Sequence, residues 1–170
     1  PYPPPLTSFM TLGILKEEGD EQRVSITPDA IPGLLKIGFK KIIVESGAGA
    51  NAFFADSDYE KQGAVAADGA SVLREADVLT RIQPFSDYSP IGSGKVLISQ
   101  LNPLGQAALV QALSKTGATV FSLDLVPRTT RAQAMDVLSS MATAAGYKAV
   151  LTAASHLPTF FPMMMTAAGT

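Results

Sequence analysis

Side chains that could bind phosphate or carboxamide oxygens gather at the head of the segment 126–147, VPRTTRAQAMDVLSSMATAAGY. Arginine offers forked N–H donors that match such oxygens, and a carboxylate is stabilised by the free N–H groups at a helix start. Small residues follow, as in a helix built for close packing. The segment therefore indicates either a ligand-binding loop or a surface loop that caps a core helix. Its polar residues are Arg128, Thr129, Thr130, Arg131, Gln133 and Asp136.

The composition excludes several other kinds of site. The net charge of −2 does not predict a nucleic-acid footprint. The absence of cysteine excludes disulfides and thiolate metal sites, and a single histidine, His156, excludes a multi-histidine metal site. Apolar residues make up 46% of the chain and charged residues 16%, so some apolar surface is expected to meet a partner.

The elements that must position the polar segment can be traced as alternating strand and helix signals. Apolar runs predict five strands, and runs of helical spacing between them predict four helices. This alternation is typical of parallel β–α–β units with right-handed crossovers. We expect an α/β three-layer sandwich with a mainly parallel sheet, a flavodoxin-like or Rossmann-like half-domain. The strands are expected at 10–15, 41–45, 78–82, 96–99 and 119–123, and the helices at 28–37, 56–62, 71–76 and 106–115.

Ligands of such sheets gather at the carboxyl ends of the strands. The loops that begin there start at Lys16, Ser46, Gln83 and Asn102, and the loop that holds Arg128 belongs to the same rim. The acidic run 17–21 is expected to be a solvated loop.

The stretch 47–52 has the G-x-G-x-x-A form that can open a dinucleotide-binding helix. The following residues, FFADSDYEKQGA, do not continue as a long helix with an apolar face. We therefore interpret it as a turn that glycine permits.

The two ends of the chain carry weaker signals. Pro1 to Pro5 predict an extended lead that lacks the pattern of a signal peptide. The stretch 149–169 has about the length of a membrane span, but Pro158 and Pro162 interrupt it. We expect a tightly packed helix ending at Pro158, and Met163 to Met165 as adaptable packing rather than a metal site.

The run PRTTRAQAMDVLSSMA, with AGYKAV and FFPMMMTAAGT, resembles the N-terminal region of the alpha subunit of proton-translocating NAD(P) transhydrogenase. In that family an Arg–Gln–Asp loop reaches the nucleotide cleft. The resemblance implies that Arg128 binds the dinucleotide near its nicotinamide end, with Asp136 and Ser139 orienting the carboxamide and ribose. Gln133 would reach toward the NADP(H)-carrying component, whereas Arg131 could be a solvated cation. The implied cofactor-binding set is Arg128, Thr129, Thr130, Arg131, Gln133, Asp136 and Ser139, with no catalytic residue and no metal ligand.

GILKEEGDEQRVSITPDAI and KIIVESGAGANAFFADSDYEKQGA resemble the N-terminal domain that transhydrogenase alpha subunits share with alanine dehydrogenases. Alanine dehydrogenases carry a lysine and a histidine where this chain has Gln83 and Asn102. Arg23 matches an arginine of their site, but arginine alone cannot do acid–base work at neutral pH. The residues therefore favour transhydrogenase.

The resemblance implies a portion of the NAD(H)-binding component of an enzyme that transfers hydride from NADH to NADP⁺ while protons cross a membrane. Expected regions are an extended lead at 1–10, an α/β domain at 11–145 and a helical tail at 146–170, which would lead into an NAD-binding Rossmann domain that the sequence lacks. NAD(H) binding is expected only with that second half, and NADP(H) on a partner component. We expect a homodimer, peripheral to the mitochondrial inner membrane on its matrix side or to a bacterial membrane on its cytoplasmic side, without a transmembrane helix. The alternative is a truncated, non-catalytic domain serving as a structural or accessory subunit of a membrane complex.

Overall fold

The computed structural model describes residues 10–159 and residue 161, and the chain divides into two compact units, Pro1–Leu125 and Val126–Thr170. The first unit contains a six-stranded sheet with helices on both faces. The second contains a 3₁₀ turn followed by a long helix. The boundaries predicted at residues 10 and 145 remain a prediction, and residue 145 lies inside that helix.

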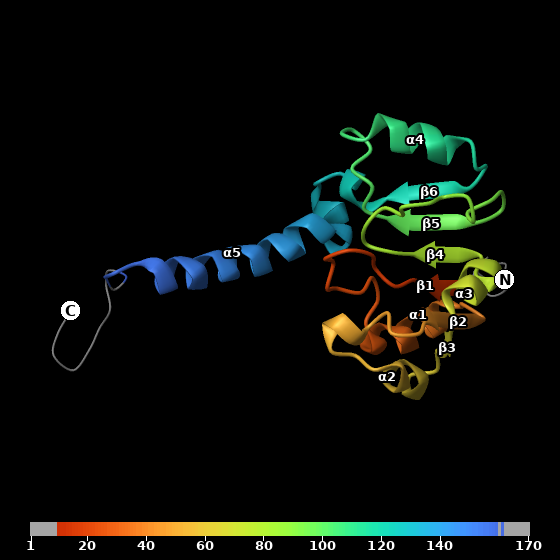
Figure 1. Ribbon diagram of the computed structural model, residues 1–170, viewed down its shortest axis with the longest axis horizontal. Helices are drawn as coiled ribbons and strands as arrows, with labels where there is room; N and C mark the ends of the chain where they lie inside the picture. Colours follow the sequence, from red (N-terminus) through yellow and green to blue (C-terminus); the bar gives the residue numbers. More distant parts are fainter. Residues whose placement is uncertain (1–9, 160, 162–170) are drawn as a thin grey trace. The chain divides into compact units, whose positions relative to one another are not determined.

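All strands of the sheet run parallel, in the order β3-β2-β1-β4-β5-β6 (Figure 1). In the central strand β1, Leu12 pairs with Ile42 of β2 on one side and with Val78 of β4 on the other. The strand order changes direction there, so the carboxyl ends of β1 and β4 flank the topological switch point. The strands are β1 Thr11–Ile14, β2 Lys41–Glu45, β3 Val65–Ala67, β4 Val78–Thr80, β5 Val96–Ser99 and β6 Thr119–Ser122.

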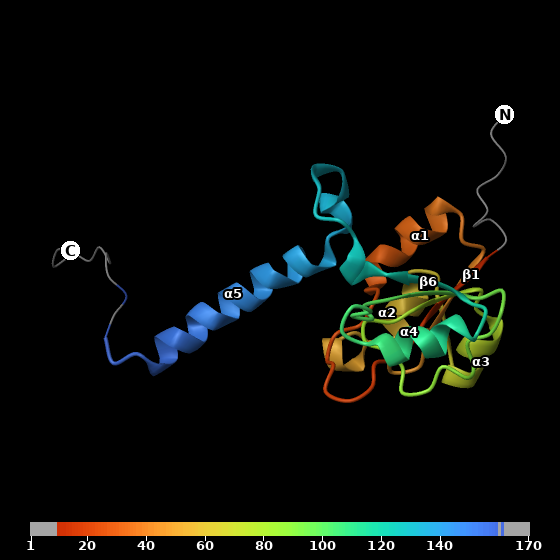
Figure 2. The ribbon, with the colours of Figure 1, turned by 90° about the horizontal axis from the view of Figure 1, so that it is seen from above.

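Helices cover both faces of the sheet and complete the predicted three-layer sandwich. Figure 2 shows α1 on one side of the strands and α3 and α4 on the other. The connection from β4 to β5, residues 81–95, is described throughout and holds no helix. The helices are α1 Ile31–Ile37, α2 Asp56–Lys61, α3 Gly69–Glu75 and α4 Ala107–Ser114, and short 3₁₀ turns lie at η2 Pro28–Ala30, η3 Ala50–Ala52 and η4 Leu123–Leu125.

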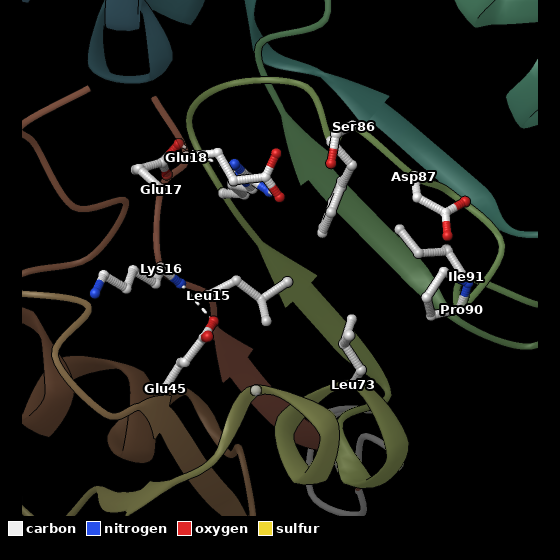
Figure 3. A pocket seen from close by; sticks show the side chains of 13 residues that line it. Leu15, Lys16, Glu17, Glu18, Glu45, Leu73, Ser86, Asp87, Pro90 and Ile91 are labelled. Atoms are coloured by element: carbon white, nitrogen blue, oxygen red, sulfur yellow. Dashed lines mark hydrogen bonds and ion pairs between the residues drawn. The ribbon is translucent and has the colours of Figure 1, made fainter. Parts of the chain in front are cut away.

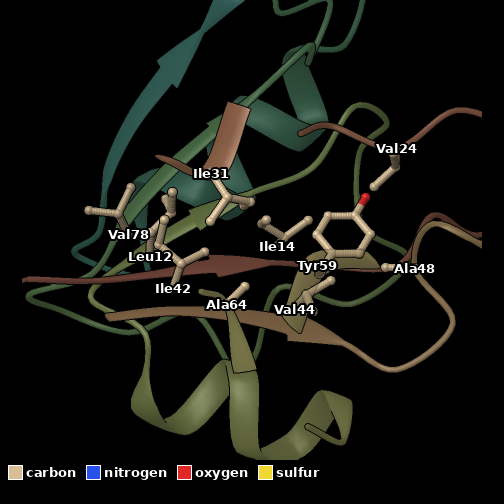
Figure 4. Packing of buried hydrophobic residues seen from close by; sticks show 10 residues of the cluster. All are labelled: Leu12, Ile14, Val24, Ile31, Ile42, Val44, Ala48, Tyr59, Ala64 and Val78. Carbon is tan, nitrogen blue, oxygen red and sulfur yellow. The ribbon is translucent and has the colours of Figure 1, made fainter. Parts of the chain in front are cut away.

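The core has two halves because side chains of a strand alternate between the faces of the sheet. In the first half, Ile31 of α1 and Tyr59 of α2 pack on Leu12 and Ile14 (Figure 4). In the second, helix residues from α3 and α4 pack on the opposite face with Ile43, Leu79 and Leu97. Both halves hold the strands whose carboxyl ends form the rim.

The expected strands and helices are present, with a few differences in detail. A sixth strand, β3, was not predicted, because its three residues Val65–Ala67 include two alanines and carry little strand preference. Thr27 precedes η2 in extended conformation, but its side chain makes no capping hydrogen bond. Gly38 ends α1 at a φ of 121°. The glycine-rich stretch is a turn, as predicted, with Gly47 at a φ of 75°.

In the second unit, η5 Thr130–Met135 leads into α5 Val137–His156. The helix ends before Pro158, as predicted, with Leu157 at its C-cap. Within the described portion of the chain no residue of α5 is buried, so the expected packing partner of its small residues does not appear. No helix among the described residues is long and apolar enough to cross a membrane. The methionines at 163–165 lie outside the described residues.

We predict that Gly13→Ala lowers the free energy of unfolding by about 1–3 kcal/mol, the usual effect of overpacking a core. A Cβ atom at Gly13 would lie 2.6 Å from the Ala76 Cβ and 2.8 Å from the Val72 Cγ1, so α3 must shift. Gly33→Ala in α1 is the matched control, because a Cβ there meets no atom within 4 Å and alanine favours helix. Urea unfolding of both variants checks this; equal stability of Gly13→Ala and wild type would contradict it.

Candidate functional site

Asp136 organises the polar segment by capping helix α5. Its Oδ1 accepts a hydrogen bond from the Ser139 backbone N–H at 2.9 Å, and its Oδ2 accepts one from the Ser139 hydroxyl at 2.6 Å. This confirms the predicted carboxylate at a helix start. The Ser139 hydroxyl, and then its backbone N–H, hold the pKa of Asp136 below its ordinary value. The carboxylate is therefore anionic at neutral pH and fixed in direction.

The other predicted side chains surround this cap on a single exposed turn. Thr129 precedes η5, and the Ala132 N–H closes that turn by donating to the Thr129 carbonyl at 2.9 Å. The Arg128 Nε lies 3.9 Å from Asp136 Oδ2, a distant ion pair whose arginine side chain is 67% exposed. Such a pair contributes little stability, so the guanidinium is free to turn toward a ligand. The exposed members of the set are Arg128, Thr129, Thr130, Arg131, Gln133 and Ser139.

A second polar cluster, which the sequence did not reveal, lies at the carboxyl ends of β1 and β4. Its centre is Arg81, which follows β4 and has only 3% of its surface exposed. The Arg81 Nε lies 3.5 Å from Oε2 of Glu17, whose side chain is 2% exposed. Glu17 also accepts the backbone N–H groups of Ile82 at 2.6 Å and Gln83 at 3.0 Å. The predicted solvated loop is therefore wrong at Glu17, which is a buried counter-ion.

Glu18 and Phe85 enclose the same guanidinium from outside. The Arg81 Nη1 donates to Glu18 Oε1 at 3.0 Å, and the Glu18 side chain remains 53% exposed. The hydrogen bond from Arg81, with further ones from Ser86, keeps the pKa of Glu18 below its usual range. The Phe85 ring stacks on the guanidinium, with its centroid 4.7 Å from the Arg81 Cζ. A cation is thus held between two carboxylates and an aromatic face.

Glu21 and Arg23 form a further pair beside this cluster. Arg23 donates from Nε at 2.8 Å and from Nη2 at 2.7 Å to the two Glu21 oxygens, and Gln83 Nε2 donates to Glu21 at 3.1 Å. Glu21 is thus the second residue of the predicted solvated loop that is paired instead, with its side chain 12% exposed. Arg23 and Gln83, the two positions compared with the alanine dehydrogenase site, therefore face the same carboxylate.

Asn102, the third compared position, lies apart from that carboxylate in a left-handed conformation with a φ of 45°. Its backbone N–H donates to Asp124 Oδ2 at 2.9 Å, and Asp124 also accepts from the Leu101 N–H and the Ser122 hydroxyl. Asparagine tolerates this backbone conformation better than most residues. Asp124 therefore fixes the carboxyl end of β5.

A pocket of about 250 Å³ opens beside the Arg81 cluster (Figure 3). Leu15, Leu73 and Ile91 give it an apolar wall, whereas Glu18, Glu45 and Asp87 give it an acidic side. Among the described residues, no group of three or more acidic or histidine side chains could hold a metal ion. One sequence signal could have revealed this cluster: an arginine inside the apolar run VLTRI requires a buried carboxylate partner.

Comparison with known proteins gives one consistent family. The family model described as "Alanine dehydrogenase/PNT, N-terminal domain" matches residues 13–145. An NAD(P) transhydrogenase subunit alpha protein of Rhodospirillum rubrum is 40% identical over 170 residues, which cover 95% of this chain and 44% of that protein. The alanine dehydrogenase of Bacillus subtilis is 30% identical, over 87% of this chain and 39% of that protein.

A solved structure described as transhydrogenase from Sinorhizobium meliloti matches with a TM-score of 0.84 at 40% identity, covering 94% of this chain and 48% of that one. An L-alanine dehydrogenase structure matches with a TM-score of 0.77 at 25% identity. These matches confirm the family recognised in the sequence and the α/β fold. The chain spans less than half the length of these relatives.

We predict that some of the stability of the first unit depends on Glu21 and is lost in acid. Mainly through the Arg23 guanidinium, the pKa of Glu21 falls from 4.5 to about 2. A carboxyl group with a lowered pKa in the folded state stabilises fully above its unfolded pKa, and this contribution disappears as the pH falls toward the folded pKa. Wild type should therefore exceed Glu21→Gln in stability at pH 6, and the difference should shrink between pH 4.5 and about 2.

Urea unfolding of both proteins across this range measures the difference. Asp20→Asn, an exposed carboxylate on the same loop, should change stability little at any pH in this range. A difference between wild type and Glu21→Gln that stayed constant with pH would contradict the pairing.

Proposed function

Because the chain belongs to the alanine dehydrogenase/PNT N-terminal domain family, we propose that it is a portion of the NAD(H)-binding component of a proton-translocating NAD(P) transhydrogenase. The observation that carries the proposal is the exposed turn 128–133, fixed against α5 by the Asp136 cap. Its donors are free in the described structure, while the carboxylates at the switch point are engaged within the fold. A nucleotide would meet available hydrogen-bonding groups on this turn.

The residues of the turn act by positioning, because hydride transfer between two nicotinamide rings requires no acid–base chemistry from the protein. Arg128 binds the dinucleotide near its nicotinamide end. Asp136 and Ser139 orient the carboxamide and ribose, with the carboxylate held anionic by the Ser139 hydrogen bonds. Gln133 extends toward the NADP(H)-carrying component. Thr129, Thr130 and Arg131 complete the contact surface.

The partners in this proposal are the NADP(H)-binding and membrane components of the enzyme, with a second copy of the chain forming a homodimer. The chain would lie at the membrane surface, on the bacterial cytoplasmic or mitochondrial matrix side. The long exposed helix α5, whose 20 residues carry one formal charge, Lys148, offers a surface for such partners. The alternative, an accessory subunit without catalysis, is favoured by the same apolar surface.

We predict that this chain by itself binds NADH weakly, with a dissociation constant on the order of millimolar or above. One polar turn offers few contacts to offset the entropy lost on association. Titration of NADH fluorescence with wild type and Arg128→Ala measures it. Tight binding that Arg128→Ala abolishes would overturn the expectation and show a working site within these residues.

We further predict that the chain supports catalysis in a chimera, in which it replaces the matching N-terminal segment of the Rhodospirillum rubrum alpha subunit. With the remaining components present, the chimera should transfer hydride from NADH to an NADP⁺ analogue. Arg128→Ala should raise the KM for NADH, and Gln133→Asn should lower kcat at unchanged KM by about tenfold, a loss of roughly 1.4 kcal/mol of transition-state stabilisation.

Lys115→Ala, an exposed cation on the first unit, is the control and should leave both constants unchanged. A chimera that folds and assembles but transfers no hydride would favour the accessory-subunit alternative. Normal kinetics in Gln133→Asn would remove that residue from the proposed site.

A further inference from the structure

The connection from β4 to β5 departs from the rest of the sheet, because residues 81–95 carry no helix. Parallel strands are usually joined through a helix, and a connection of this length without one is commonly a lid or binding loop. Its two ends are anchored in the fold. At the start, the Ile82 and Gln83 N–H groups bond Glu17, and near the end Ile91 is 1% exposed.

Between these anchors, residues 84–90, here named the strap, form one wall of the pocket (Figure 3). The lining residues that belong to the strap are Phe85, Ser86, Asp87 and Pro90, and the opposite wall includes Leu15 and Leu73. Inside the strap, Phe85 donates its N–H to the Tyr88 hydroxyl at 2.9 Å, and the two rings meet edge to face at 5.5 Å. The strap is therefore an ordered wall with its own small aromatic cluster.

Only a few contacts hold the strap against the sheet. Phe85 stacks on Arg81, and Glu18 joins Arg81 and Ser86 by hydrogen bonds. The Glu18 side chain is about half exposed, so water competes for these bonds. The closed arrangement also has a cost, because the buried Nε and Nη2 of Arg81 have no hydrogen-bond partner in the described structure. Movement of Phe85 away from Arg81 would admit water to these donors.

We infer that the strap opens as a unit about Gln83 and Ile91, and that Glu18 is the latch that holds it over the pocket. Opening widens the pocket at the switch point and uncovers the guanidinium. Closing restores the stacking of Phe85 and the bonds of Glu18. The ion pair with Glu17, which is almost fully buried and bonded to the anchor at Gln83, persists in both arrangements.

Amide hydrogen exchange of the 170-residue chain tests this inference. The Phe85 N–H and the Ile91 N–H, which donates to the Tyr88 carbonyl at 2.9 Å, report on the strap. Glu18→Ala should accelerate the exchange of both about tenfold, because it removes hydrogen bonds to charged groups. Glu18→Gln, which keeps the shape and some of the bonding, should give a smaller acceleration. Phe85→Leu, which removes the stacking face, should accelerate exchange of the Ile91 N–H.

Asp20→Ala is the matched control, because it removes an exposed carboxylate from the same loop outside the pocket lining. It should leave exchange of the strap unchanged. Exchange of the Leu79 amide in β4 should also be unchanged in every variant, since only the strap opens. Unaltered exchange in Glu18→Ala, or equal acceleration at Leu79, would overturn the inference.

Discussion

The buried ion pair between Arg81 and Glu17 is the constraint on which the arrangement of the first unit depends. A guanidinium that is 3% exposed requires a carboxylate, and a buried charge left without its partner typically costs about 3–5 kcal/mol. Glu17 comes from the loop after β1, and Arg81 directly follows β4. Their pairing therefore joins the two strands at the switch point. Bonds from Glu17 to the following backbone N–H groups also fix the direction in which the chain leaves β4.

The two units of the chain differ in how their polar groups are used. At the rim of the sheet, Glu17, Glu21 and Asp124 accept hydrogen bonds from side chains and backbone within the same unit. These carboxylates stabilise loops and leave little capacity for a ligand. On the turn before α5, the arginines and Gln133 project into solvent, and only Asp136 is committed to local structure. This contrast is the physical basis for assigning nucleotide contacts to the turn.

Local signals in the sequence predicted the fold well. Alternating apolar runs located β1, β2, β4, β5 and β6, and Asp136 was expected at a helix start, because these depend on neighbouring residues alone. β3 was missed, since its pairing with β2 rather than its own composition makes Val65–Ala67 a strand. The pairing of Arg81 with Glu17 was also missed, because it joins residues far apart in the chain. The ligand contacts of the turn remain predictions from the family resemblance.

The position of β1 also has a consequence for the order in which the chain folds. β1 is the first strand to be synthesised, yet it is central, and one of its two neighbours, β4, begins only at Val78. Parallel pairing over such a separation must overcome the entropy of closing a long loop, which slows folding. During translation, the segment β1–β3 can associate early, but it presents the unpaired side of β1. A chaperone that shields this edge until β4 emerges from the ribosome would limit aggregation of the nascent domain.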